Sequence, residues 1–287
     1  MAIKDFPCTL HQQVLTEELL MTYPGLLPQA YDEATAMATL AIRFAQKQGA
    51  TLAMVPFDCT VEAEALGAPI TGREDFFGLR AAGHSCESAE ALAALQPFSW
   101  QEGRPRQVVE AIGHLVTAGY EPCLNWSGFL TVADMLLGVE TIFLHWQEQQ
   151  ALFQHFAFQL AKGLLSYGLA AQEKGCRIFS YSDPLAALSL AGPAIAKQIA
   201  KEWLVPFLRQ WLALPGSGLL HLCGKSSCAL AAAGCVEIEE IPLTTSYGYQ
   251  QGVVTLAARN SSRILLGQGC LNQNQAVQVL RRLHLKD

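Results

Sequence analysis

The sequence predicts an α/β fold in which a parallel sheet closes into a barrel of the TIM (β/α)8 type. Short apolar, strand-like runs alternate with segments of helical periodicity over most of the 287 residues. Repeated strand, helix, strand order implies parallel strands joined by right-handed crossovers. Because one such barrel runs to roughly 250 residues, we expect a single domain over residues 1–287.

Local signals bound each expected element. The helix 33–48 has Asp32 as its expected cap and ends before Gly49, and a buried strand follows at 51–57. The segment 242–262 has no dominant periodicity and is left unassigned. The other expected strands are 120–125, 177–181, 218–223, 236–241 and 263–266. The other expected helices are 106–118, 129–138, 141–174, 193–213, a short one ending near Gly234, and 273–284.

Composition and charge exclude several classes of protein. Hydrophobic residues make up 51% and charged residues 15%, which argues for a large core and against disorder. A net charge of -6 gives no cationic field for nucleic acid. No apolar run reaches the roughly 18 residues of a membrane span, and the start lacks a signal-peptide pattern. We therefore expect a cytoplasmic protein, whose nine cysteines are thiols or metal ligands rather than disulfides.

Functional side chains of a barrel enzyme lie at the carboxyl ends of the strands, because the loops there build the site. Among the selected residues, Glu62 and Glu64 also suit the first turn of a helix, so both a site role and a helix-stabilising role stay open for them. The residues that follow or end the expected strands are Asp58, Thr60, Glu62, Glu64, Asn125, Ser127, Tyr181, Asp183, His221, Cys223, Glu239, Glu240 and Cys270.

His221 and Cys223 form the sharpest chemical signal. They lie two residues apart on an expected strand, so both side chains face the same side of the sheet. Imidazole and thiolate suit Zn²⁺, which takes about four ligands and, in catalytic sites, three from the protein with one position open. The pair therefore predicts part of a zinc site.

The remaining ligands are expected from later strands. Cys270 ends a strand-like run and is the expected third ligand. Glu239 is expected to turn inward and to act as a fourth or exchangeable ligand, with Glu240 as its rival. Cys228 and Cys235 are weaker competitors for the third position, because one is expected on a helix and the other at the buried start of a strand.

Four stretches match one known family in content and in order. They are VPFDCTVEAEALG at 55–67, GFLTVADMLLG at 128–138, YSDP at 181–184 and HLCG at 221–224. Through them the chain resembles the uroporphyrinogen decarboxylase superfamily, and within it the methylcobamide:coenzyme M methyltransferase branch. The resemblance implies a TIM barrel whose C-terminal part is shortened, since relatives of this type are longer. It also implies zinc held by His-x-Cys and a later cysteine.

The resemblance further implies a function. The chain is expected to move a methyl group from a methylated corrinoid, carried by a separate corrinoid protein, to a small thiol such as coenzyme M. Zinc would hold that thiol as the thiolate nucleophile, with methylcobalamin or a related corrinoid as the methyl donor. The residues expected to act in catalysis or shape the cavity are Glu62, Tyr181 and Asp183, and those expected to contact the cofactor are Asp58, Asn125 and Ser127.

Two alternatives remain open at this stage. One is a decarboxylase-like enzyme acting on a tetrapyrrole, in which Asp58 or Asp183 would bind pyrrole nitrogens without a metal. The sequence lacks the arginine-rich amino-terminal motif of the decarboxylases, which argues against it. The other is a non-catalytic, corrinoid-binding homologue. Metal content separates the methyltransferase from both alternatives.

Overall fold

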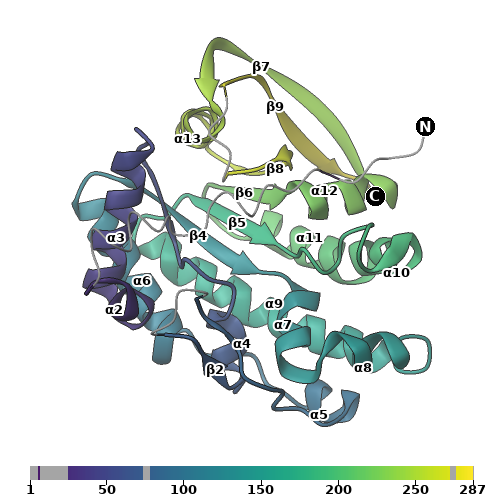
Figure 1. Cartoon of the computed structure of the whole chain (residues 1–287). Helices are drawn as coiled ribbons and strands as arrows, with labels where there is room; N and C mark the ends of the chain where they lie inside the picture. Colours follow the sequence, from purple (N-terminus) through teal and green to yellow (C-terminus); the bar gives the residue numbers. More distant parts are fainter. Residues whose placement is uncertain (1–5, 7–24, 74–77, 272–275, 287) are drawn as a thin grey trace.

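A mostly parallel, seven-stranded sheet forms the centre of the molecule (Figure 1), seen in a computed structural model that describes residues 6, 25–73, 78–271 and 276–286. The strand order is β1-β4-β5-β6-β8-β9-β7. The first five strands in this order are parallel, whereas β9 runs antiparallel to both β8 and β7. The predicted α/β class is therefore confirmed. The strands are β1 (Leu52–Val55), β4 (Glu121–Ser127), β5 (Ile178–Ser182), β6 (Gly218–Cys223), β7 (Val236–Gly248), β8 (Arg263–Gly269) and β9 (Ala276–Leu285), with a separate hairpin of β2 (Ile70–Thr71) and β3 (Arg80–Ala81).

Most helices cover one face of this sheet, and α13 (Tyr249–Arg259) lies on the other (Figure 1). No helix in the described part of the chain is long and apolar enough to cross a membrane. The remaining helices are α2 (Leu27–Asp32), α3 (Ala34–Lys47), α4 (Val61–Ala65), α5 (Ala89–Ala93), α6 (Gly103–Thr117), α7 (Phe129–Leu137), α8 (Val139–Leu144), α9 (Gln150–Glu173), α10 (Gly192–Ile199), the π-helical turn η2 (Ala200–Leu204), α11 (Val205–Ala213) and α12 (Gly224–Ala232).

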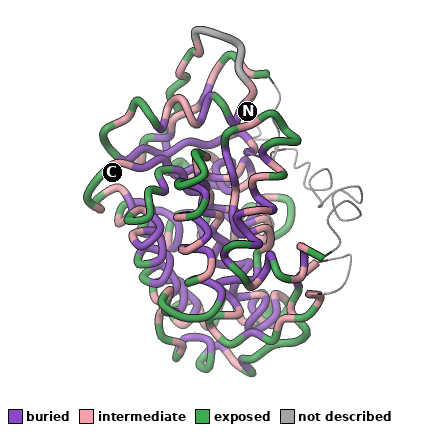
Figure 2. Tube along the Cα trace, turned by 90° about the vertical axis from the view of Figure 1, so that its left-hand side faces the viewer, coloured by how far each residue is buried: buried purple, intermediate pink, exposed green. Residues whose placement is uncertain are grey.

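Strand alternation sorts the side chains of the sheet into two cores. In β6, Leu220 and Leu222 pack in the large core shared with the outer helices, whereas Leu219 packs in a smaller core with Tyr249 and Val253 of α13. Figure 2 shows the buried segments running through the middle of the molecule. We call the side of the sheet that carries Leu219 the inner face.

The sheet is not closed into a barrel within the described residues, where β1 and β7 form its two edges. Instead, α13 lies across the inner face and contacts β7, β9 and β1. Gln250 fixes this helix, because its Nε2 donates to Gln48 Oε1 at 3.1 Å and to the Leu271 carbonyl at 2.7 Å. Beyond β8, the sheet therefore continues with the antiparallel strands β9 and β7, and α13 covers its inner face. A full barrel would continue with parallel strands at this place.

The prediction of a last helix over 273–284 was wrong, because residues 276–285 form β9. Leu280 and Leu283 are both buried, and their spacing of three residues also suits a helix. Leu283 instead lies opposite Leu265 of β8 and Ile238 of β7. Pairing on both sides with distant strands decides the conformation, and such tertiary context overrides local propensity.

Two further differences concern local signals. The unassigned segment 242–262 completes β7 and contributes α13. Asp32 ends α2 and binds Arg73 with both carboxylate oxygens, at 2.7 and 3.1 Å, and Glu33 is the residue preceding α3. Asp32 therefore serves an ion pair rather than the expected cap.

Candidate functional site

A row of polar side chains crosses the inner face near the carboxyl ends of three central strands. Asn125 of β4 lies in register with Ser180 of β5, which lies in register with His221 of β6. Neighbours in register point to the same side of a sheet, so these side chains share the inner face with apolar residues such as Leu219. Polar groups on such a face mark a candidate site.

His221 is almost completely buried, at 1% exposure. Its Nε2 lies 3.1 Å from the hydroxyl oxygen of Tyr249, and its Nδ1 is buried with no hydrogen-bond partner in the described part of the chain. Burial lowers the pKa of His221 to about 4. The imidazole is therefore neutral at pH 7, which is the form that binds metal ions.

Cys223 ends β6 and immediately precedes α12, so its thiol lies at the amino end of that helix. Its sulfur lies 3.3 Å from the hydroxyl of Ser226, which also accepts the backbone N–H of Asp183 at 3.3 Å. Since Ser226 accepts from Asp183, its own hydrogen remains available for the sulfur. The contact with Ser226 therefore holds the Cys223 side chain at the amino end of α12.

A register shift brings the end of β8 toward Cys223. After His221 pairs with Leu266, the next paired residues are Cys223 and Gly269, so β8 carries an extra residue there. Gln268 takes up this bulge with a positive φ of 54°, and its N–H donates to Ser227. Bulges of this kind re-aim side chains beside functional sites.

Tyr249 packs directly on this bulge. A Cβ added to Gly269 would lie 2.1 Å from the Tyr249 hydroxyl, so only glycine fits beneath the ring. Burial, and secondarily the charge of Cys270, raises the pKa of Tyr249, which indicates that the Cys270 thiol also lies nearby. Tyr249 is thus adjacent to His221 and to the segment that carries Cys270.

The donor types at this place suit Zn²⁺, because a neutral imidazole and two thiols are its preferred ligands. The orphaned Nδ1 of His221 and the thiol of Cys223 provide two of them. However, the described side chains contain no group of three or more His, Cys, Asp or Glu residues that could hold a metal. His221 and Cys223 both lie at the carboxyl end of β6, and the sheet register shifts between them.

Glu239, the expected fourth ligand, does not join this pair. It lies on β7, and β8 and β9 separate that strand from β6. Its carboxylate is 2.8 Å from Nε2 of His284, and its rival Glu240 pairs with Arg281 at 3.2 Å, both near the surface. The sequence indicated a parallel strand here, whereas β7 pairs antiparallel with β9 at the edge of the sheet.

Tyr181 and Asp183, expected to act in catalysis, face the outer helices instead. The Asp183 carboxylate accepts the backbone N–H groups of Leu130 and Thr131 at 2.9 and 3.1 Å and the Thr131 hydroxyl at 2.8 Å. Tyr181 accepts the N–H of Phe129 and donates to Asp183. Because these contacts satisfy the amino end of α7, both residues hold that helix against β5.

Glu62 is fully buried beside the end of β4. Its Oε1 accepts the N–H of Ser127 at 3.4 Å, while Oε2 has no partner in the described part of the chain. Burial raises the pKa of Glu62 to about 7, so this carboxyl can exchange a proton near neutral pH. The Ser127 hydroxyl donates to the Cys59 carbonyl at 2.8 Å, and the amide of Asn125 donates to the Pro56 carbonyl at 3.0 Å. Asn125 and Ser127, expected cofactor contacts, thus tie β4 to the segment after β1.

Asp58, the other expected cofactor contact, is engaged in a buried ion pair. Its carboxylate lies 2.5 Å from Arg104 and also accepts from Thr60, and Arg104 in turn reaches Glu64 at 3.1 Å. A buried carboxylate with such partners is costly to release. Asp58 and Glu64 therefore anchor α6 to the end of β1.

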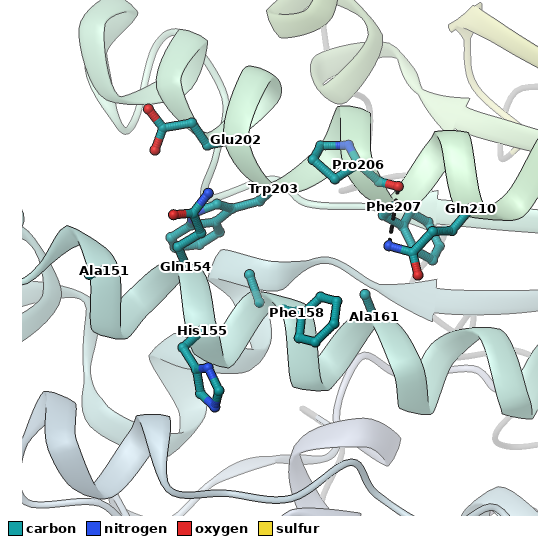
Figure 3. Close-up of a pocket in the computed structure, with 11 residues that line it drawn as sticks. Ala151, Gln154, His155, Phe158, Ala161, Glu202, Trp203, Pro206, Phe207 and Gln210 are labelled. Atoms are coloured by element: carbon teal, nitrogen blue, oxygen red, sulfur yellow. Dashed lines mark hydrogen bonds between the residues drawn. The ribbon is translucent and has the colours of Figure 1, made fainter.

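One groove in the described part of the chain lies outside this region. This groove of about 330 Å³ runs between α9 and the η2–α11 segment, with Phe158, Trp203 and Phe207 among its lining residues (Figure 3). None of the predicted site residues lines it. A second cavity beside Tyr181 and Asp183 measures only about 10 Å³, which is about the space of one water molecule.

The protein is of the α/β class, with a mostly parallel central sheet and with His221 and Cys223 at the carboxyl end of its central strand β6. The sequence profile of the uroporphyrinogen decarboxylase (URO-D) family matches residues 2–248, and the chain belongs to this family. The predicted resemblance is confirmed.

Known relatives agree with this membership. Methylcobamide:CoM methyltransferase MtbA of Methanosarcina acetivorans is 24% identical over 238 residues, which cover 80% of this chain and 68% of the relative. Methylcobamide:CoM methyltransferase MtaA of Methanosarcina barkeri is 26% identical over 233 residues, covering 78% and 66%. A solved methyltransferase structure from Methanosarcina mazei superposes with a TM-score of 0.61 at 24% identity, covering 75% of this chain and 64% of the other. The chain thus spans about two thirds of the length of these relatives.

Sequence reasoning missed several residues of this region. Tyr249 lies in the segment that had no dominant periodicity, and only its contact with His221 reveals it. Ser180, which lies in register with His221, has no sequence pattern that marks it as a site residue. Ser226 did have a signal in the sequence. It lies three residues after Cys223, the residue before α12, and a polar side chain at this spacing can reach back to the residue at the helix start.

Proposed function

We propose that this chain transfers a methyl group from a methylated corrinoid, presented by a corrinoid protein, to a small thiol such as coenzyme M. The observation that carries the proposal is the neutral, buried His221 beside Cys223 at the carboxyl end of β6. The names of the relatives, methylcobamide:CoM methyltransferases, supply the donor and acceptor. Methyl transfer to sulfur requires a thiolate nucleophile.

Zinc held by His221 and Cys223 would supply a Lewis acid that keeps a coordinated thiol deprotonated at neutral pH. Cys270 is our proposed third protein ligand, because it follows Gly269, the residue paired with Cys223. His221 contributes a nitrogen that is unprotonated over the physiological range, since its pKa is about 4.

The chain's own residues position these ligands. Ser226 orients the Cys223 side chain through the contact with its sulfur. Glu62, whose pKa is about 7, is the buried group that can hold or release a proton beside the end of β4. Asn125 and Ser127 order the backbone around it.

The decarboxylase-like alternative fits this arrangement less well. It needs Asp58 or Asp183 to bind pyrrole nitrogens, yet Asp58 is paired with Arg104 and Asp183 with the amino end of α7. If either carboxylate bound pyrrole nitrogens instead, its present partners would remain buried without a hydrogen-bond acceptor. Each such group costs about 1–3 kcal/mol. Methyl transfer requires neither contact to break.

Zinc content is the direct test. We expect about one zinc per chain in the wild type by elemental analysis after dialysis against a weak chelator, and loss in Cys223→Ser. Loss in Cys270→Ser as well assigns it as the third ligand. Cys235→Ser, which changes a half-buried thiol bonded to the Ala233 carbonyl, serves as the matched control and should retain zinc.

Turnover then separates an enzyme from a binding protein. The absorbance change on demethylation of methylcobalamin, with coenzyme M as acceptor, should depend on Cys223 and persist in Cys235→Ser. A chain that binds zinc but never demethylates the corrinoid would favour the non-catalytic alternative. A chain without zinc in any sample would eliminate the proposed mechanism.

A further inference from the structure

The side chain of Phe6 packs against the first turn of α12, next to the candidate site. Gly224 is the first residue of this helix and directly follows Cys223, which ends β6. A Cβ added to Gly224 would collide with three atoms of the Phe6 ring, so the ring lies against the α-carbon of the glycine. An aromatic side chain that is far away in the sequence thus meets the carboxyl end of a central strand.

The contact itself explains why residue 224 is a glycine. Gly224 does not have the positive φ that favours glycine, so its backbone conformation accepts any residue. What excludes a larger residue is the space taken by the Phe6 ring. The two side-chain sizes at positions 6 and 224 therefore fit each other.

The turn of helix beneath Phe6 also holds the Cys223 thiol. Ser226, in that first turn, lies 3.3 Å from the sulfur through its hydroxyl oxygen and is 3% exposed. Gly224 is buried as well, whereas Cys223 and Phe6 are both half-buried. The ring therefore covers the start of α12 beside a thiol that keeps part of its surface open to solvent.

We propose that Phe6 forms one wall of the opening that leads to the Cys223 thiol, and that this wall limits the opening to small molecules. The inference rests on the proposed function, because it takes the end of β6 as the reactive site. It deepens that function by assigning a residue that selects the size of the acceptor. A large apolar ring suits this role, since it excludes bulk without offering a polar group that would bind.

Two maleimides of different size test the wall. N-ethylmaleimide and fluorescein-5-maleimide react with the same thiolate through the same double bond, so the ratio of their rates at Cys223 reports access rather than thiol pKa. Peptide mass spectrometry assigns the modified residue in reduced, chelator-treated protein. In Phe6→Ala we expect the bulky reagent to react about 10-fold faster than in the wild type, and the small reagent to change by less than about twofold.

Gly224→Ala tests the same contact from the other side. Its methyl group takes the place of the ring, so the bulky reagent should again react about 10-fold faster at Cys223. Phe6→Leu keeps most of the apolar bulk and should stay near the wild type. Cys235, another half-buried thiol, is the internal control whose rates should not change. Thermal unfolding checks that each variant is folded.

The outcomes separate this wall from the function on which it rests. Selective acceleration of the bulky reagent at Cys223 in both Phe6→Ala and Gly224→Ala supports the wall. Unchanged rates in either variant overturn it, and so does equal acceleration of both reagents, because Phe6 would then bury the thiol without selecting by size. Acceleration at Cys235 as well would mean a general loosening of the fold and also overturns it. The rates need neither zinc nor turnover, so a chain with the selective change but no methyl transfer keeps the wall and loses only the proposed function.

Discussion

The hydroxyl of Ser226 lies 3.3 Å from the sulfur of Cys223 and also accepts the backbone N–H of Asp183. One side chain thereby connects the loop after β5, on the side of the outer helices, with the thiol at the end of β6. Ser226 is 3% exposed, so neither contact is exchanged readily for water. The position of the Cys223 sulfur is thus set by the packing of α12 as well as by β6.

Replacing Ser226 by alanine should weaken metal binding without removing a ligand. Loss of the hydroxyl removes the hydrogen-bond partner that orients the Cys223 side chain, so we expect zinc affinity to fall about 10-fold. Chelator competition measures the change. Ser99→Ala, an exposed serine that accepts only a local backbone bond, is the control. Unchanged affinity in Ser226→Ala would show that the sulfur is oriented without it.

Glu62→Gln should change how stability depends on pH. The folded-state pKa of about 7 lies above the ordinary 4.5, so the wild type has its full stability contribution below about pH 4.5 and loses it as pH rises through 7. Glutamine does not ionise, and the variant should exceed the wild type by about 2–3 kcal/mol at pH 8. Urea unfolding at pH 5 and pH 8 measures this difference. A constant difference between the two proteins would contradict the raised pKa.

Asp183→Ala should destabilise the fold, because it leaves the N–H groups of Leu130 and Thr131 without their acceptor. We expect a loss of about 3 kcal/mol in the free energy of unfolding. Asp183→Asn keeps one acceptor oxygen and should fall between this variant and the wild type. Thermal or urea unfolding provides the measurement. Wild-type stability in the alanine variant would argue against the structural role that the contacts assign to Asp183.

Glu239→Gln should leave zinc content unchanged. Its partner His284 lies on β9, and both side chains are about half exposed, so the pair contributes little, with an expected change in stability within about 0.5 kcal/mol. Elemental analysis of Glu239→Gln and Cys223→Ser, run side by side, compares the zinc content of a surface variant with that of a variant of a proposed ligand. Loss of zinc in Glu239→Gln would mean that β7 approaches β6 in the metal-bound protein.

Local patterns in the sequence identified most elements of the fold. Strands β1, β4, β5, β6 and β8 are short apolar runs between helical segments, and their parallel pairing follows from the crossover connections. The pattern could not identify β9, because leucines three residues apart suit a helix as well as a strand. It also could not decide closure, since that depends on which segment meets the far edge of the sheet.

The two-residue repeat of a strand predicts, from the sequence alone, that His221 and Cys223 share one face of the sheet. The surroundings of the pair depend on contacts between distant segments. Tyr249 reaches His221 across 28 residues, and Asp183 meets α7 from 52 residues away. Likewise, Glu239 lies on the edge strand β7, because β7 pairs with β9 rather than with β6. Local periodicity therefore determined which residues share a face, whereas the neighbours of that face were decided only by tertiary packing, since contact between remote segments leaves no repeat in the chain.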